Sequence, residues 1–266
     1  MHKLNRRPRY RMLAAAALAL TAINAASPVL AETVAPVVDL TPATPTENTF
    51  EFTISALSQS DTQSVTYQGV IRPIMEVDFS DINDPVITSM DFAGQASDIV
   101  HSDATATLGA LGTVSLNDIL SCIVTFPTSV PAPVTGASSP FSFSSSDHEI
   151  IFGAGMVEVN PSIGSPTTVD LATEPFRRSL GGTNDSTVAL TLNNIAAGVA
   201  TYDLEIIIPL IQVNVETDDP GINALVDILV DGNLVAKTQI MRQIPEPASL
   251  ILCACAVPWV LQRRRQ

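Results

Sequence analysis

Positive charge is scarce in this chain outside its two ends. Of its 13 lysines and arginines, five precede residue 12 and three follow residue 262, which leaves five between Glu32 and Glu246. All 27 aspartates and glutamates lie in that central region, so its net charge is −22. Because Lys and Arg hold nucleic-acid backbones, this deficit excludes nucleic acid as a partner, and it favours repulsion from anionic membranes.

Cysteines and large polar aromatics are also rare. Two of the three cysteines and the only tryptophan lie after residue 252. Cys122 is thus alone in the central region and cannot form an intramolecular disulfide, so a buried core must hold the fold; about 200 residues are enough to bury one. The central region has two tyrosines, Tyr67 and Tyr202, and both fall on predicted core faces. This argues against a sugar-binding surface built from exposed rings.

The N-terminal residues have the composition of an export signal. Residues 1–12 contain five cations and no acid, and residues 12–23 (MLAAAALALTAI) form a short apolar run. This order predicts a secretory signal peptide over residues 1–31. Cleavage is expected between Ala31 and Glu32, because Val29 and Ala31 suit the two positions that signal peptidase reads. Pro8 follows the Arg6-Arg7 pair where a twin-arginine signal has a different continuation, so we expect the Sec machinery to export the chain.

The C-terminal residues form a second address signal. Pro245, Glu246 and Pro247 are followed by a fourteen-residue apolar run, residues 248–261, and then by Arg263, Arg264 and Arg265. The two prolines keep Glu246 on open, extended backbone. The apolar run would enter a bilayer as an anchor helix while the arginines stay on the cytoplasmic side. Fourteen helical residues span only about 21 Å against roughly 30 Å of hydrocarbon, which is short for a permanent anchor.

These three parts, a literal Pro-Glu-Pro, an apolar segment and a terminal arginine cluster, resemble the PEP-CTERM sorting signal of Gram-negative bacteria. The resemblance covers residues 245–265 only. It implies recognition of the tripeptide by a membrane-embedded exosortase, transient attachment to the inner membrane, and delivery to the cell surface or to an exopolysaccharide matrix. An ordinary C-terminal membrane tail is the alternative.

The sequence between the two signals predicts a series of short strands. The mature chain opens with residues 32–48, rich in Pro, Thr and Val, which predict a flexible leader. Alternation places Phe50, Phe52 and Ile54 on one face of a strand, and a second alternating run, residues 65–71, is expected to pair with it. Around residues 115–123 the spacing of apolar residues fits a short helix as well as a strand, and the choice stays open.

Residues 127–146 are rich in Pro, Ser and Thr and predict a long surface loop, or a linker between two halves; the sequence leaves open whether the halves form one sandwich or two domains. Beyond it, strands are expected over residues 148–159, 187–192 and 199–216, with a bulge or a corner between sheets at Pro209, where the apolar parity changes.

A hairpin with the three-residue loop 231–233 is predicted to place Asp227 opposite Lys237. Because strand patterns and turns recur and no long amphipathic helix intervenes, we expect an antiparallel β-sandwich over residues 49–244.

The central region contains no recognisable catalytic motif. His101 and His148 are its only histidines, and neither belongs to a zinc or nucleophile motif. Cys122 is expected to be a buried inert thiol. Two of the many carboxylates could serve a glycoside hydrolase, yet their number makes such pairs uninformative. We therefore expect no enzyme and no obligatory cofactor.

Calcium is the one metal that the composition favours. Hard oxygen ligands recur in three acidic loops, and none of the three has EF-hand spacing. The residues concerned are Asp78, Asp81 and Asp84, then Asn184 and Asp185, then Asp218 and Asp219.

Two functions follow from these expectations. The first is a structural or adhesive surface protein, an acidic sandwich exported and sorted through the PEP signal. The second is a carbohydrate-binding or carbohydrate-cleaving module delivered to extracellular polysaccharide. The scarcity of aromatic rings favours the first.

Overall fold

The protein is all β in the residues that the computed structural model describes, 31–40, 47–126, 131–180, 186–215 and 227–244. Those residues contain no α-helix, only the 3-10 turns η1 (Gly109–Leu111) and η2 (Ser145–Asp147). Strands of the first part are β1 (Ala31–Val34), β2 (Val38–Leu40), β3 (Thr49–Ala56), β4 (Gln59–Ile71), β5 (Pro73–Asp78), β6 (Val86–Phe92), β7 (Ile99–His101), β8 (Ala104–Thr107) and β9 (Gly112–Thr125). Strands of the second part are β10 (Val134–Thr135), β11 (Phe141–Phe143), β12 (His148–Pro161), β13 (Thr167–Asp170), β14 (Phe176–Ser179), β15 (Ser186–Ala196), β16 (Val199–Val215) and β17 (Asp227–Gln243).

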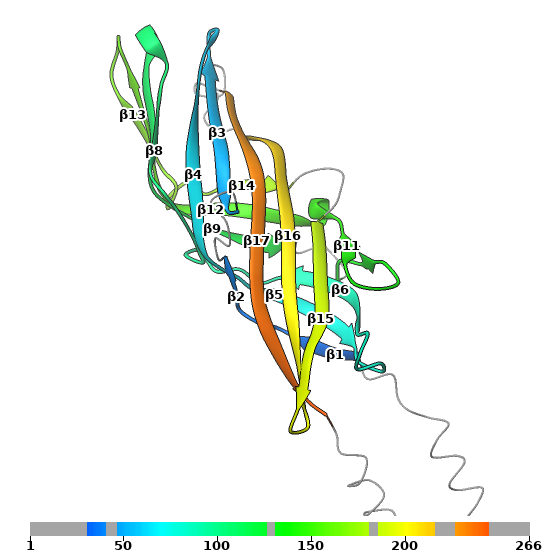
Figure 1. The fold of residues 1–266 in the computed structure, drawn as a ribbon. Coiled ribbons are helices and arrows are strands. Elements are labelled where there is room, and N and C mark those ends of the chain that lie inside the picture. The colour runs from blue at the N-terminus through cyan, green and yellow to red at the C-terminus, as the bar shows by residue number, and fades with distance from the viewer. Residues whose placement is uncertain (1–30, 41–46, 127–130, 181–185, 216–226, 245–266) are drawn as a thin grey trace, which may run out of the picture.

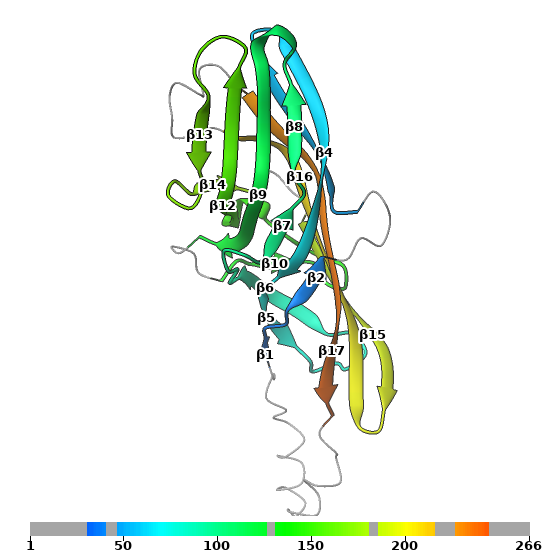
Figure 2. The same ribbon diagram turned by 90° about the vertical axis from the view of Figure 1, so that its left-hand side faces the viewer.

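Two antiparallel sheets build an elongated body (Figures 1 and 2). A large sheet follows the path β10-β11-β15-β16-β17-β2-β4-β7-β9-β12-β13, and a small sheet has the order β1-β5-β6. Strand β1 and the C-terminal end of β17 lie toward one end of the body, which we call the base (Figures 1 and 2). The tips of the β3–β4, β8–β9 and β12–β13 hairpins lie at the opposite end, which we call the apex.

One contiguous apolar cluster, whose fully buried members run from Val38 to Ala236, draws on both sheets. Phe50, Phe52 and Ile54 are buried together, as their alternation predicts. The predicted pairing of β3 and β4 is confirmed, although most of it uses residues 59–64, ahead of the predicted run. Among the described residues, all the buried members of the cluster lie inside residues 32–244.

Residues 115–123 form part of strand β9, and the helical alternative is wrong. Two compensating register shifts separate β9 from β12 near Asp118 and Gly153, and Asp118 has a left-handed backbone (φ 53°). Such a bulge inserts an extra residue and moves the buried side from even to odd positions. Leu116 therefore packs against the core before the bulge and Ile119 is buried after it, and their spacing of three residues imitates a helix.

The strand through Pro209 continues without changing sheets. Strand β16 runs for 17 residues, and its register against β17 shifts between Leu210 and Val213. The predicted bulge thus lies next to Pro209, whereas the predicted corner is wrong. Strand β16 can be this long because β17 pairs with it from Val199 to Val215, and β15 pairs with it as far as Ile207.

The hairpin predicted at residues 231–233 does not form, because these residues lie inside the unbroken strand β17. Gly232 pairs with Leu210 on one side and with Phe50 on the other. A β-carbon at Gly232 would lie 2.5 Å from Cδ1 of Phe50, so the glycine provides room for a packed ring rather than a turn.

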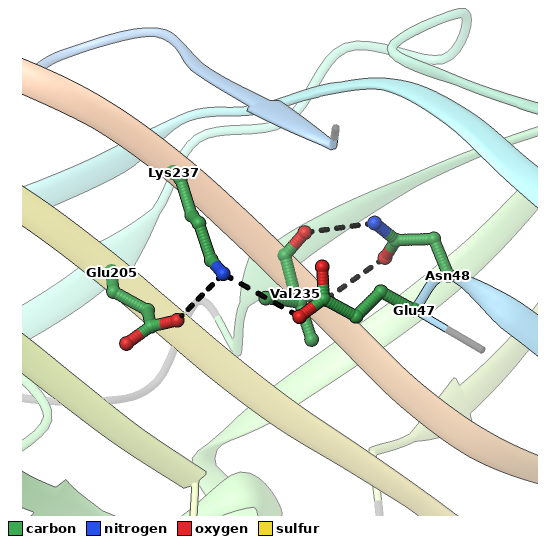
Figure 3. A network of polar contacts seen from close by, with 5 residues as sticks. All are labelled: Glu47, Asn48, Glu205, Val235 and Lys237. Carbon is green, nitrogen blue, oxygen red and sulfur yellow. Dashed lines mark hydrogen bonds and ion pairs between the residues drawn. The ribbon is translucent and has the colours of Figure 1, made fainter. Parts of the chain in front are cut away.

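The ion pair between Asp227 and Lys237 is also wrong, since both residues belong to one strand. Lys237 instead lies opposite Glu205 on β16 and contacts its carboxylate at 3.0 Å (Figure 3). Its ammonium group also lies 3.4 Å from Glu47. Beside this pair, the side chain of Asn48 donates to and accepts from the backbone of Val235, which joins the start of β3 to β17 (Figure 3).

Two segments expected to lie outside the core contribute to it. The leader predicted over residues 32–48 contains β1 and β2, and Val38 and Leu40 are buried where β2 lies between β4 and β17. The predicted loop 127–146 supplies Phe141 and Phe143, which are buried where β11 pairs with β15. Three-residue strands such as these are too short for a periodic signal, so composition alone misassigned them.

Candidate functional site at the base

The base brings the predicted signal-peptidase site onto a sheet. Ala31 pairs with Asp78, and Glu32 with Val77, as β1 adds to β5. The other predicted site residues, Pro245, Glu246, Pro247, Arg263, Arg264 and Arg265, lie outside the described residues. The predicted start of the mature chain therefore lies in β1, an edge strand of the small sheet, rather than in a free leader.

An ion pair connects this edge strand to the last strand of the body. Nε of Arg242, near the end of β17, lies 2.9 Å from Oε2 of Glu32. The Arg242 side chain is mostly shielded, with 15% of its surface exposed, and its guanidinium stacks 4.5 Å above the Phe79 ring. A guanidinium over an aromatic face adds attraction beyond the ion pair itself.

Phe79 is in turn fixed by Tyr202 of β16. The two ring centroids lie 5.4 Å apart, and the Tyr202 hydroxyl donates to the carbonyl of Ile82 at 2.9 Å. Burial raises the pKa of Tyr202, so the hydroxyl keeps its proton. The loop after β5 is thereby tied to the large sheet directly behind the Glu32–Arg242 pair.

Sequence reasoning missed Arg242, although a signal was present. Arg242 follows Leu234, Ala236 and Ile240 at even positions of β17, the side that faces the core. A cation at an inward position requires a carboxylate partner near by. Glu32 was read as part of a flexible leader, so the pairing could not be anticipated.

The described residues end one position before the predicted sorting tripeptide. The backbone N–H of Ile244 donates to the carbonyl of Gly198 in the β15–β16 turn at 2.8 Å. Pro245 is the next residue in the chain. Three extended residues, 245–247, span only about 10 Å. Any membrane segment that starts at Ala248 would therefore hold the base close to the membrane surface.

A shallow groove of about 360 Å³ runs between the two chain ends. Its lining comprises Glu32, Thr33, Val34, Ala35, Pro36, Phe79, Gln239, Ile240, Met241 and Arg242. The charged groups in this lining already neutralise each other, and neither a histidine nor a cysteine is among them. The groove thus offers surface for contact.

The two histidines and the cysteine considered from the sequence do not converge on one site. His101 lies 2.7 Å from the Ser121 hydroxyl, and His148 lies 3.1 Å from the Thr125 hydroxyl. Burial lowers the pKa of both rings. Cys122 is buried, and burial, together with nearby carboxylates, raises the pKa of its thiol. The prediction of a buried, unreactive thiol is consistent with this environment.

His148 and its neighbour Glu149 are both buried but have different partners. His148 packs against the rings of Phe92 and Phe143, whereas Glu149 binds Arg177 at 3.0 Å.

Calcium ligation stays a prediction. In the first acidic loop, Asp78 accepts from the backbone of Ser80, and Asp81 accepts from the backbone of Asn83. Asn184, Asp185, Asp218 and Asp219 lie outside the described residues. Within the described part of the chain, no three His, Cys, Asp or Glu side chains are grouped to hold a metal ion.

Comparisons with known proteins leave the family open: the chain matches no family model, no curated protein and no solved structure. Among the residues that the structure describes, none belongs to a helix of the length and apolar character needed to span a bilayer.

Proposed function

We propose that this chain is an exported surface or extracellular-matrix protein of a Gram-negative bacterium, sorted through Pro245, Glu246 and Pro247 by an exosortase. The Sec machinery would export the chain, signal peptidase would remove residues 1–31, and the apolar tail with its arginines would hold the body at the inner membrane until processing. The body itself would act as a structural or adhesive module without catalysis.

The observation that carries this proposal is the Glu32–Arg242 pair. It joins the predicted mature N-terminus to a residue three positions before Pro245. The pair thus brings the start of the described chain and the end of β17 together at the base, and the rest of the described body extends away from it. A body held at a membrane through the residues that follow Ile244 and displayed outward would have this arrangement.

The proposed architecture is a β-sandwich. Met75, Val77, Ile87 and Met90 of the small sheet share one buried cluster with Leu204, Ile206 and Leu234 of the large sheet. Apolar faces of two sheets that meet in one core are the defining feature of a sandwich.

The alternative is a carbohydrate-binding or carbohydrate-cleaving module. Tyr67 and Tyr202 are both buried, as predicted, so neither can stack on a sugar. A polysaccharide pull-down with residues 32–244 tests this alternative, because saturable binding would favour it over the structural role.

Processing is the direct test of the sorting proposal. Glu246→Ala should leave export intact while uncleaved protein accumulates in the inner membrane. Replacing Arg263, Arg264 and Arg265 by Ser should instead release unprocessed protein to the periplasm, because the positive anchor is lost. Cell fractionation with intact-mass analysis separates the two outcomes.

The matched control is Glu174→Ala, which removes one exposed acid from the body. It should be processed like the wild type. A wild-type surface protein that still carries residues 248–266 would contradict the proposal.

A further inference from the structure

Three hairpin tips meet at the apex, far from the chain ends (Figures 1 and 2). The tip of β3–β4 touches that of β8–β9, since a β-carbon on Gly109 would lie 3.4 Å from Oε1 of Gln59. The tip of β8–β9 is bonded to that of β12–β13 by the backbone N–H of Ser162, which donates to the carbonyl of Leu111 at 2.9 Å. The tips therefore form one continuous surface.

This surface carries apolar side chains and no charge. The tips 56–59, 108–112 and 161–166 contain no acidic or basic residue in a chain with 27 acids. Leu57 is 71% exposed and Ile163 is 94% exposed. With Met241 at the base, they are the most exposed large apolar side chains of the described residues.

The backbone holds Leu57 outward at a cost. Leu57 and Ser58 are the two central residues of the β3–β4 turn, and both have left-handed φ angles, 45° and 70°. Such a turn favours Asn-Gly, and a bulky residue there is unfavourable. The corresponding turn at the base, Ala197-Gly198, places a glycine at its second position. Leu57 gains little packing for this strain, and a strained exposed residue points to binding.

We propose that the apex inserts Leu57 and Ile163 into the interface of an uncharged, zwitterionic lipid surface. Protruding hairpin tips can enter a deformable lipid interface more readily than a preformed pocket. Because the tips are uncharged, their desolvation on entry costs little free energy. The described acid Asp61 follows the β3–β4 tip closely in the chain. Anionic headgroups would be repelled by this carboxylate and would find no cation in the three tips to attract them.

Flotation with lipid vesicles tests this proposal. Residues 32–244 are used, because they contain every buried member of the described core and because the apolar runs near both ends of the full chain would enter a bilayer themselves. After a cooperative thermal unfolding transition has been verified, the protein should float with phosphatidylcholine vesicles. Adding phosphatidylglycerol to the vesicles should weaken binding at low salt.

Three variants locate the contact. Ile163→Ser should weaken binding roughly tenfold, since one large apolar side chain no longer enters the interface. Leu57→Asn should weaken binding to a similar extent and yet raise the melting temperature, because Asn tolerates the left-handed turn. Met241→Ser changes an equally exposed residue at the base and should leave binding unchanged.

Several outcomes would overturn the proposal. Wild-type protein that does not float with phosphatidylcholine vesicles would do so, as would stronger binding when phosphatidylglycerol is added. Loss of binding in Met241→Ser would move the contact to the base. Sedimentation that shows dimers lost in Ile163→Ser would identify a second copy of the chain, rather than lipid, as the partner.

Discussion

His148 makes the stability of the body sensitive to pH in a window where carboxylates contribute little. The ring is fully buried, 4.9 Å from the Phe92 ring and 5.5 Å from the Phe143 ring. Nδ1 contacts the Thr125 hydroxyl, and no described residue bonds to Nε2. Protonation would therefore leave a buried N–H without an acceptor. Burial lowers the pKa of His148 from 6.5 to about 4, although Asp147 and Asp91 oppose the shift.

The sign follows from proton linkage. The unfolded chain binds a proton below pH 6.5, whereas folded His148 stays neutral until about pH 4. The free energy of unfolding should thus fall by about 1.4 kcal/mol per pH unit, or about 3 kcal/mol from pH 6.5 to pH 4. Burial lowers the pKa of His101 to about 3, so a second loss of similar size occurs in this window. Together they approach the whole stability of a typical domain, roughly 5–15 kcal/mol.

Urea unfolding at intervals between pH 7 and pH 4.5 measures this slope. The wild type should lose about 2.7 kcal/mol per pH unit near pH 5.5, and His148→Phe about half of that, whatever its stability at pH 7. Phe suits the aromatic surroundings, and His101→Phe is the matched variant. A wild-type slope below about 1 kcal/mol per pH unit, or an unchanged slope in both variants, would refute the reasoning.

Two further predictions concern backbone packing and the exposed face of the large sheet. Gly69→Ala should abolish the cooperative unfolding transition seen by circular dichroism, because its β-carbon would lie 2.0 Å from the carbonyl oxygen of Asp98 and the backbone has φ 123°; a variant that melts like the wild type would contradict this contact. A double-mutant cycle on Lys237 and Glu205 should give a coupling of roughly 0.2–1 kcal/mol in urea unfolding. The same cycle on Lys237 and Asp227 should give none, and the reverse result would restore the predicted hairpin.

Long alternating runs could be predicted from the sequence because one buried face dictates their pattern. Phe50, Phe52 and Ile54 are an example, and Tyr202 with Leu204 is another. Around these residues each strand buries every second side chain. The alternation can therefore be recognised without knowing the partner strand.

Long-range contacts explain why other predictions from the sequence were wrong. Gly232 resembles a turn residue in its local sequence. The Phe50 ring, which is distant in the chain, instead leaves no room for a side chain at this position. Asp118 interrupts alternation through a bulge that only the pairing with β12 reveals. Of the candidate site, the sequence identified Glu32 as a cleavage position, and its bond to Arg242 joins residues 210 positions apart.

The length of strand β17 determines how the body would resist a pulling force. It runs from the apex, where Asp227 pairs with Ser55, to the base, where Gln243 pairs with Val199, over about 56 Å for 17 residues. Its hydrogen bonds to β16 lie across its length. A pull on the C-terminal end at Ile244, resisted at the apex, would load these bonds together in shear, instead of opening them one after another.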